Sequence, residues 1–182
     1  PEEPPGDPNA GHRERLRDRL VAGGPDALLD HEIVELLLTL TLPRVDTKPL
    51  AKALLAEFGS VAGLFAADFA SIGRVKGMGR RSAAAFKIVE AAALRLLRDR
   101  VMERPVLASW QALLDYLRAD MAHRLNERVR VLHLDSRNRL VRDECMAEGS
   151  VDQASIHPRE VLRRAIDLGS AAIILVHNHP TH

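Results

Sequence analysis

The sequence has only one cysteine, few aromatic residues and no large excess of either charge. Cys145 is the single cysteine among 182 residues, and Phe, Trp and Tyr together make up 3%. A single cysteine excludes a disulfide or a cysteine-rich zinc module within this sequence, and it is typical of a reducing, cytoplasmic setting. Because aromatic residues are scarce, the core must come from the Leu, Ala, Val and Ile in its 46% apolar content.

Charge and hydropathy exclude two further classes of protein. The net charge of +1 does not indicate a general polyanion binder, so any nucleic-acid contact must come from a local basic patch. No apolar run approaches the roughly 20 residues that span a bilayer, so no membrane partner is expected. Residues 1–12 are rich in Pro, Gly and acidic residues, contain no signal-peptide hydrophobic region, and are expected to form a disordered lead-in.

Apolar residues recur at helical spacing from residue 13 to about residue 100, which predicts an all-α N-terminal domain. Asp30 and Asp68 are expected to cap helices, and Gly59 is expected to end one. A loop is expected over 42–47. The predicted helical segments are 33–38, 50–58, 61–65, 68–74 and 80–100.

The pattern changes after Pro105, and a second domain is predicted over 105–182, with the boundary near 100–105. Strand, strand, helix and strand follow in that order, which indicates an α+β or α/β fold with a mixed sheet. The predicted helices are 110–124, with Ser109 as its cap, and 159–168, with Pro158 at its start and Gly169 at its end. The predicted strands are 128–134, 140–146 and 171–176, the first two joined by a turn over 135–138.

A glycine turn joins two of the N-terminal helices. Gly77-Met78-Gly79 between helices is the sequence form of a helix-hairpin-helix. The amides that begin the second helix form an anion site, and Lys76, Arg80 and Arg81 add positive charge. These features predict contact with a DNA backbone, without readout of base sequence. The alternative is a structural turn that binds nothing or binds protein.

Two histidines follow the last predicted strand. His177 and His179 are two residues apart, so they share one face with Cα atoms about 6–7 Å apart. Imidazoles at this spacing can converge on one divalent metal, and α/β folds place their sites at such strand ends. The alternative is a polar loop after a strand.

The motif around these histidines resembles that of a known family. His177-Asn178-His179-Pro180, preceded by the apolar strand and by the upstream segment 157–161 (HPREV), is similar to the RadC family of the JAB/MPN (JAMM) metalloprotease-like superfamily. The resemblance covers most of the chain, from the N-terminal helix-hairpin-helix region to a JAMM-type C-terminal domain. Residues 42–49 depart from the commoner glycine-containing version of that loop.

The resemblance implies a zinc-dependent hydrolase of amide bonds in a protein or peptide, associated with DNA and with DNA repair. His177 and His179 match its metal ligands, and Glu127 best matches the acid that takes a proton from the attacking water. The third ligand, an Asp, is expected beyond the end of this chain, and Thr181 and His182 stand where the family has Ser and Gly. The domain is therefore expected to be incomplete at its C-terminus, inactive, and able to hold zinc weakly or not at all.

Other acidic and histidine residues compete for these roles. Glu144 and Glu148 are expected on an exposed strand face, and the helix dipole explains Glu160 in a first helical turn. His157 is expected at a helix start and His133 on an exposed face. Cys145 is expected to be buried. The hairpin arginines are expected to be exposed to solvent, namely Arg137, Arg139 and Arg142.

Two functions without catalysis stay open at this stage. One is a DNA-binding adaptor that uses the glycine turn. The other is a protein-interaction module in which the Ala-rich helical segment 82–95 is the partner surface. The oligomeric state is left open.

Overall fold

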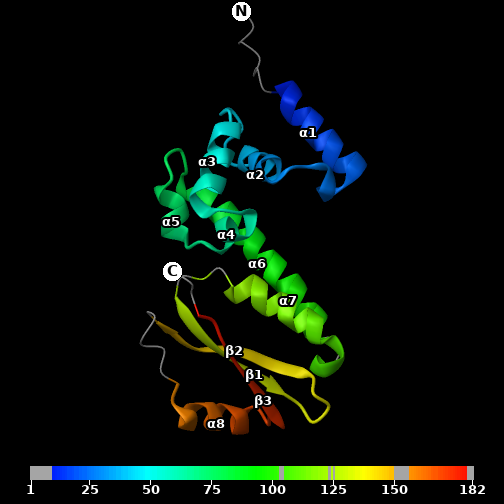
Figure 1. Cartoon of the computed structure of the whole chain (residues 1–182), viewed down its shortest axis with the longest axis vertical. Helices are drawn as coiled ribbons and strands as arrows, with labels where there is room; N and C mark the ends of the chain where they lie inside the picture. Colours follow the sequence, from blue (N-terminus) through cyan, green and yellow to red (C-terminus); the bar gives the residue numbers. More distant parts are fainter. Residues whose placement is uncertain (1–9, 103–104, 123, 125, 150–155, 180–182) are drawn as a thin grey trace, which may run out of the picture. The chain divides into compact units, whose positions relative to one another are not determined.

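Helices form the first part of the chain, and strands appear only in the second (Figure 1). The structure is a computed structural model, and it describes residues 10–102, 105–122, 124, 126–149 and 156–179. Two units separate by their internal contacts, 1–90 and 91–182. This division falls inside a helix, earlier than the boundary that the sequence indicates near residues 100–105. The α+β class is confirmed.

The first unit is helical throughout its described residues. Its elements are α1 (Ala10–Gly23), a short 3-10 turn (Pro25–Ala27), α2 (Asp30–Thr39), α3 (Lys48–Phe58), α4 (Val61–Ala66), α5 (Phe69–Arg74) and the first part of α6 (Arg80–Met102). Because α1 begins at Ala10, residues 10–12 are helical and do not belong to a disordered lead-in; residues 1–9 lie outside the described part. No helix in the described part of either unit has both the length and the apolar character needed to cross a bilayer.

Most helix ends in this unit follow the predicted signals. The Asp68 carboxylate accepts a hydrogen bond from the Ser71 amide at 2.8 Å and caps α5 as predicted. Gly59 ends α3 in the left-handed region, with φ of 77°. The predicted cap at Asp30 is wrong, because Leu29 holds the capping position and Asp30 is the first helical residue. An acid in a first turn is favoured by the helix dipole, which explains its presence there.

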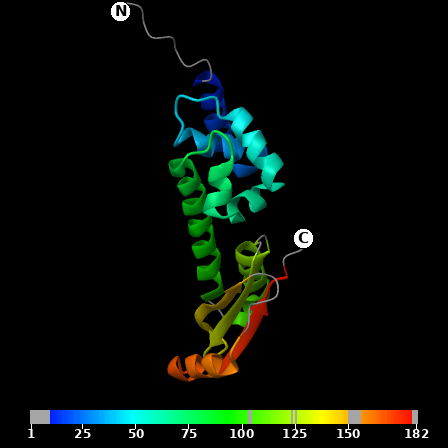
Figure 2. The same cartoon turned by 90° about the vertical axis from the view of Figure 1, so that its left-hand side faces the viewer.

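The core of the first unit lies where α2 to α5 meet the first turns of α6, and Figure 2 shows these helices side by side. Its fully buried members include Val34, Leu38, Ala51, Leu54, Leu64, Ile72 and Phe86. Lys87 donates to the carbonyls of Phe65 and Ala67, both at 2.9 Å, and so satisfies acceptors at the end of α4. Arg13 donates to the carbonyls of Pro43 and Val45 and holds the predicted loop at 42–47.

The second unit is built on a three-stranded sheet. Its elements after α6 are a 3-10 turn (Val106–Ser109), α7 (Trp110–Met121), β1 (Glu127–Leu134), β2 (Leu140–Gly149), α8 (Pro158–Asp167) and β3 (Ala172–His177). The strand order is β2-β1-β3, and both pairings in the described residues are antiparallel, so the expected mixed sheet is not found there. β2 and β3, which α8 connects, run parallel to each other, but β1 separates them. Ser109 holds the capping position of α7 as predicted, but its side chain makes no capping bond, because its hydroxyl donates to the Pro105 carbonyl.

Helices lie on both sides of this sheet (Figure 1). Leu132 and Leu134 of β1 pack with Leu113 and Leu117 of α7. Since side chains alternate along a strand, the residues between them face the side of α8. The central strand is therefore covered on both faces, and Val131, Leu132, His133 and Leu134 are all buried.

A polar cluster ties α7 to β1 and β2. Arg130 donates to Asp143 at 2.8 Å and pairs with Asp120, and the Tyr116 hydroxyl donates to Asp143 at 2.5 Å. Burial by itself would lower the pKa of Arg130, but the hydrogen bond to Asp143 and the two nearby carboxylates outweigh it and raise that pKa. Burial and the bond to Asp143 raise the pKa of Tyr116. Arg130 therefore stays charged and holds the two carboxylates together.

Two leucines at the C-terminal end of α2, one inside the helix and one just past it, test the position of the first core. Leu38 is fully buried, whereas Leu40, just past the end of the helix, is 76% exposed. Leu38→Ala should lower the free energy of unfolding by about 2–5 kcal/mol because it leaves a cavity. Leu40→Ala should change it by less than about 0.5 kcal/mol. Urea unfolding of the two variants checks this, and equal effects would place the core elsewhere.

Candidate functional site

The two histidines meet at the end of β3. His177 is the last residue of the strand and pairs with Val129 of β1. Its Nε2 atom lies 2.8 Å from Nε2 of His179, and the two rings meet edge to face with centroids 4.5 Å apart. Both side chains are exposed. The prediction that they share one side is confirmed.

Glu127 lies beside this pair. It is the first residue of β1, and its Oε1 atom is 3.5 Å from Nδ1 of His179, with only 18% of the Glu127 side chain exposed. The antiparallel register explains this meeting, because the position two residues beyond the Val129–His177 pair brings Glu127 opposite His179. A carboxylate beside Nδ1 favours a proton there and leaves the Nε2 lone pair available as a metal ligand.

The competing carboxylates are engaged or distant. Glu144 accepts two hydrogen bonds from Arg164, one of them at 3.0 Å, and this interaction lowers the pKa of Glu144. Glu148 pairs with Arg128 at 2.9 Å. Glu160 is exposed in the first turn of α8. Among the described acidic residues, Glu127 alone is paired with the histidine cluster.

The histidine pair fits a divalent metal in part. Two zinc–nitrogen bonds of about 2.0–2.1 Å at a tetrahedral angle put the nitrogens about 3.3 Å apart, close to the 2.8 Å between the Nε2 atoms. However, no group of three His, Cys, Asp or Glu side chains in the described residues has a geometry that could hold a metal ion. The pair thus offers two ring nitrogens at a suitable separation, and their role as metal ligands and the third ligand that the resemblance implies both stay predictions.

Two sequence-based expectations in this unit are wrong. His133 is fully buried, with Nδ1 3.0 Å from the Ser170 hydroxyl and Nε2 3.9 Å from Glu144. The alternating pattern predicts one exposed face, but helices cover both faces of β1. Cys145 is exposed, because β2 is an edge strand. The expected exposure of Arg137, Arg139 and Arg142 is confirmed.

The glycine turn between α5 and α6 has an open surface. Gly77 has φ of 95°, which side chains rarely adopt, whereas a Cβ added at Gly79 would meet nothing within 4 Å. Lys76, Arg80 and Arg81 are exposed, and in the described part of the chain none of them makes a hydrogen bond or ion pair.

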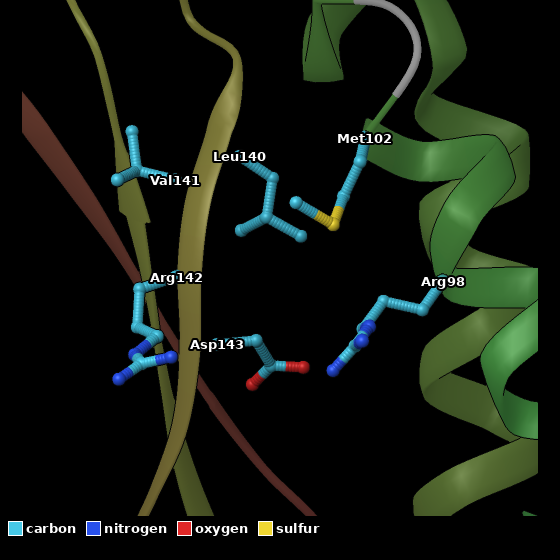
Figure 3. Close-up of a pocket in the computed structure, with 6 residues that line it drawn as sticks. All are labelled: Arg98, Met102, Leu140, Val141, Arg142 and Asp143. Atoms are coloured by element: carbon cyan, nitrogen blue, oxygen red, sulfur yellow. The ribbon is translucent and has the colours of Figure 1, made fainter.

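Two hollows lie away from the histidines. One, of about 130 Å³, is lined by Arg98 and Met102 of α6 and by residues 140–143 of β2 (Figure 3). Its acid, Asp143, is already bound to Arg130 and Tyr116. The other is an apolar groove of about 430 Å³ in the first unit, lined by residues of α1, of α2 and of the segment between them, and by Leu40. Neither contains a residue predicted to be functional.

The described chain is a helical unit followed by an α+β unit that carries a histidine pair at a strand end, and comparisons with known proteins show which family it belongs to. The family described as RadC-like JAB domain matches residues 107–182, and the family described as UPF0758 N-terminal matches residues 9–84. A UPF0758 protein of Rhodobacter capsulatus is 52% identical over 166 residues, covering 91% of this chain and 78% of the relative. A UPF0758 protein of Ruegeria pomeroyi is 48% identical over 170 residues, covering 93% and 76%. The chain belongs to the UPF0758 family, whose name states no activity.

The buried His133 makes stability depend on pH. Burial lowers its pKa below the usual 6.5, so the unfolded chain binds the proton more readily than the folded one. Stability is therefore complete above the unfolded pKa and falls as pH drops through about 6.5 toward the lower folded value, by at most about 1.4 kcal/mol per pH unit. His133→Gln should reduce this slope in urea unfolding between about pH 7.5 and 5.5.

The exposed His157 is the matched control for this experiment. His157→Gln should keep the slope of the unsubstituted protein. Glu144 does not contribute to the slope in this pH range. Because its pKa is lowered in the folded protein, the stability that it contributes is lost only at pH values below 4.5. An unchanged slope in His133→Gln would show that another group is responsible.

Proposed function

We propose that the protein is a zinc-dependent hydrolase of amide bonds in a protein or peptide, with its site at the end of β3. His177 and His179 would hold the metal, and Glu127 is the general base. The observation that carries the proposal is the meeting of the two Nε2 atoms at 2.8 Å, beside a mostly buried carboxylate. The single cysteine supports a cytoplasmic location.

The side chains divide the chemistry between them. A bound zinc ion would lower the pKa of water and polarise the carbonyl under attack. Glu127 takes the proton of the attacking water and delivers it to the leaving nitrogen, and it also orients the His179 ring through Nδ1. A catalytic zinc commonly has three protein ligands, and the proposal assigns the third to the Asp that the resemblance implies.

Zinc binding tests the two histidines directly. In equilibrium dialysis over a range of zinc concentrations, a protein that carries the Asp implied by the resemblance should bind one zinc ion, and His177→Ala or His179→Ala should abolish that binding because each removes a nitrogen ligand. His157→Ala, at an exposed position at the start of α8, is the control and should bind as before. Binding that survives both site substitutions would overturn the proposal.

The same experiment separates the roles of Glu127. As a base rather than a ligand, it can be replaced in Glu127→Gln with zinc still bound, although loss of its support for His179 should weaken binding by about 10- to 100-fold. In the cobalt-loaded protein the pH-dependent change of the visible spectrum should move to lower pH, since a nearby carboxylate opposes the loss of a proton. A spectrum that titrates as before would exclude Glu127 as the base.

A second candidate function is contact with a DNA backbone at the glycine turn, as in a DNA-repair protein. Arg80 and Arg81 begin α6, and no acid lies in its first turn, so these cations oppose the helix dipole and gain no partner in the described chain. The open space over Gly79 gives a phosphate room to approach the amides. The two cations therefore destabilise the start of α6 when nothing is bound there, and they attract an anion to that position.

Salt-dependent DNA binding tests this second function. In fluorescence anisotropy with a duplex, the slope of log affinity against log salt should become shallower by about 2 in an Arg80→Ser, Arg81→Ser variant, because two phosphate contacts are lost. Gly79→Ala should weaken binding without changing stability. Arg137→Ser with Arg139→Ser, on the hairpin of the other unit, is the charge-matched control. If control and test variants lose the same affinity, the turn has no specific role.

A further inference from the structure

We infer that Asn178, the residue between the two histidines, is the positioning residue that holds Glu127 against them. Its side chain bonds the backbone immediately before and immediately after Glu127. The inference rests on the proposed role of Glu127 as general base, but the contacts that carry it involve no metal.

The Asn178 amide bridges two backbone groups of the neighbouring segment. Its Oδ1 atom accepts a hydrogen bond from the Arg128 amide at 2.8 Å, and its Nδ2 group donates to the Asn126 carbonyl at 3.2 Å. Only one orientation of the side chain puts its oxygen on the N–H and its nitrogen on the C=O. Both ends of the amide therefore have a matching partner.

These bonds complete a strand pairing that the backbone leaves unfinished. β3 ends at His177, and the Asn178 amide reaches the Arg128 carbonyl at a long 3.4 Å. In a regular antiparallel pair, Arg128 would also donate to the backbone carbonyl opposite. Here the Asn178 side chain supplies that acceptor instead.

These two bonds fix the backbone on both sides of Glu127. With the carbonyl before it and the amide after it both bonded to one side chain, the peptide planes on either side of Glu127 are fixed. The direction of its Cα–Cβ bond is then fixed too. Asn178 lies between His177 and His179 in the chain, so its two bonds fix the Glu127 carboxylate relative to both imidazole rings. Precise sites require this kind of support from residues that hold the functional side chains in place.

Two substitutions of Asn178 separate its two bonds. Asn178→Ala removes both partners, and Asn178→Asp keeps the acceptor but loses the donor to the Asn126 carbonyl. The Asn126 side chain takes no part, because only its backbone carbonyl is used. Asn126→Ala is therefore a matched control, at an exposed position next to the same contact.

Nuclear magnetic resonance of the metal-free protein tests the inference. Exchange of the Arg128 amide proton with solvent should become about 3- to 10-fold faster in Asn178→Ala, as expected for the loss of one hydrogen bond, and should stay unchanged in Asn126→Ala. The second readout is the chemical shift of the ring nitrogens of His179, and how far Glu127→Gln changes it. That change should be large in the unsubstituted and Asn126→Ala backgrounds and at least halved in Asn178→Ala.

The outcomes separate this inference from the proposed function. If the His179 shifts respond to Glu127→Gln equally in all backgrounds, Asn178 only ends the strand and the inference is wrong, even where zinc binds. If the response is lost in Asn178→Ala, the positioning role is confirmed, even where dialysis finds no zinc and the hydrolase proposal fails. Asn178→Asp adds a graded result, since it should keep the protection of the Arg128 amide while weakening the response at His179.

Discussion

The antiparallel pairing of β1 with β3 is the interaction on which the candidate site depends. Val129 pairs with His177, and the same register continued beyond the strand end puts Glu127 beside His179. A slip of one residue would turn the carboxylate to the opposite face of the sheet, away from both rings. The site is thus a property of strand register, although its residues lie about fifty positions apart in the chain.

Packing on both faces of β1 keeps that register in place. Leu132 and Leu134 contact α7 on one side, while His133 is enclosed on the other, near Ser170 and Glu144. With both faces buried, any shift of the strand would expose apolar groups and bury unpartnered polar ones, and both changes cost free energy. The polar cluster around Arg130 adds specific pairings that a shifted strand could not make.

Much of the fold could be predicted from local signals. Asp68, Gly59 and Pro158 each mark a helix end through a short-range rule, and the structure has all three ends where the sequence indicates them. The failures come from contacts that the local signals do not include. Leu29 takes the capping position expected for Asp30, and Ser109 keeps its position but bonds the Pro105 carbonyl in place of a helix amide. The burial of His133 depended on helices that pack on both faces of its strand, which alternation alone does not reveal.

The sequence by itself determined the family resemblance, the class of fold and the convergence of His177 and His179, because two residues two apart at a strand end must share a side. Only the tertiary structure decided that Glu127, rather than Glu144 or Glu148, lies beside them, and that Asn178 bonds the backbone on both sides of it. The physical reason is that these contacts depend on the alignment of two strands distant in the chain. That alignment is selected by the burial of the whole sheet and not by any local pattern.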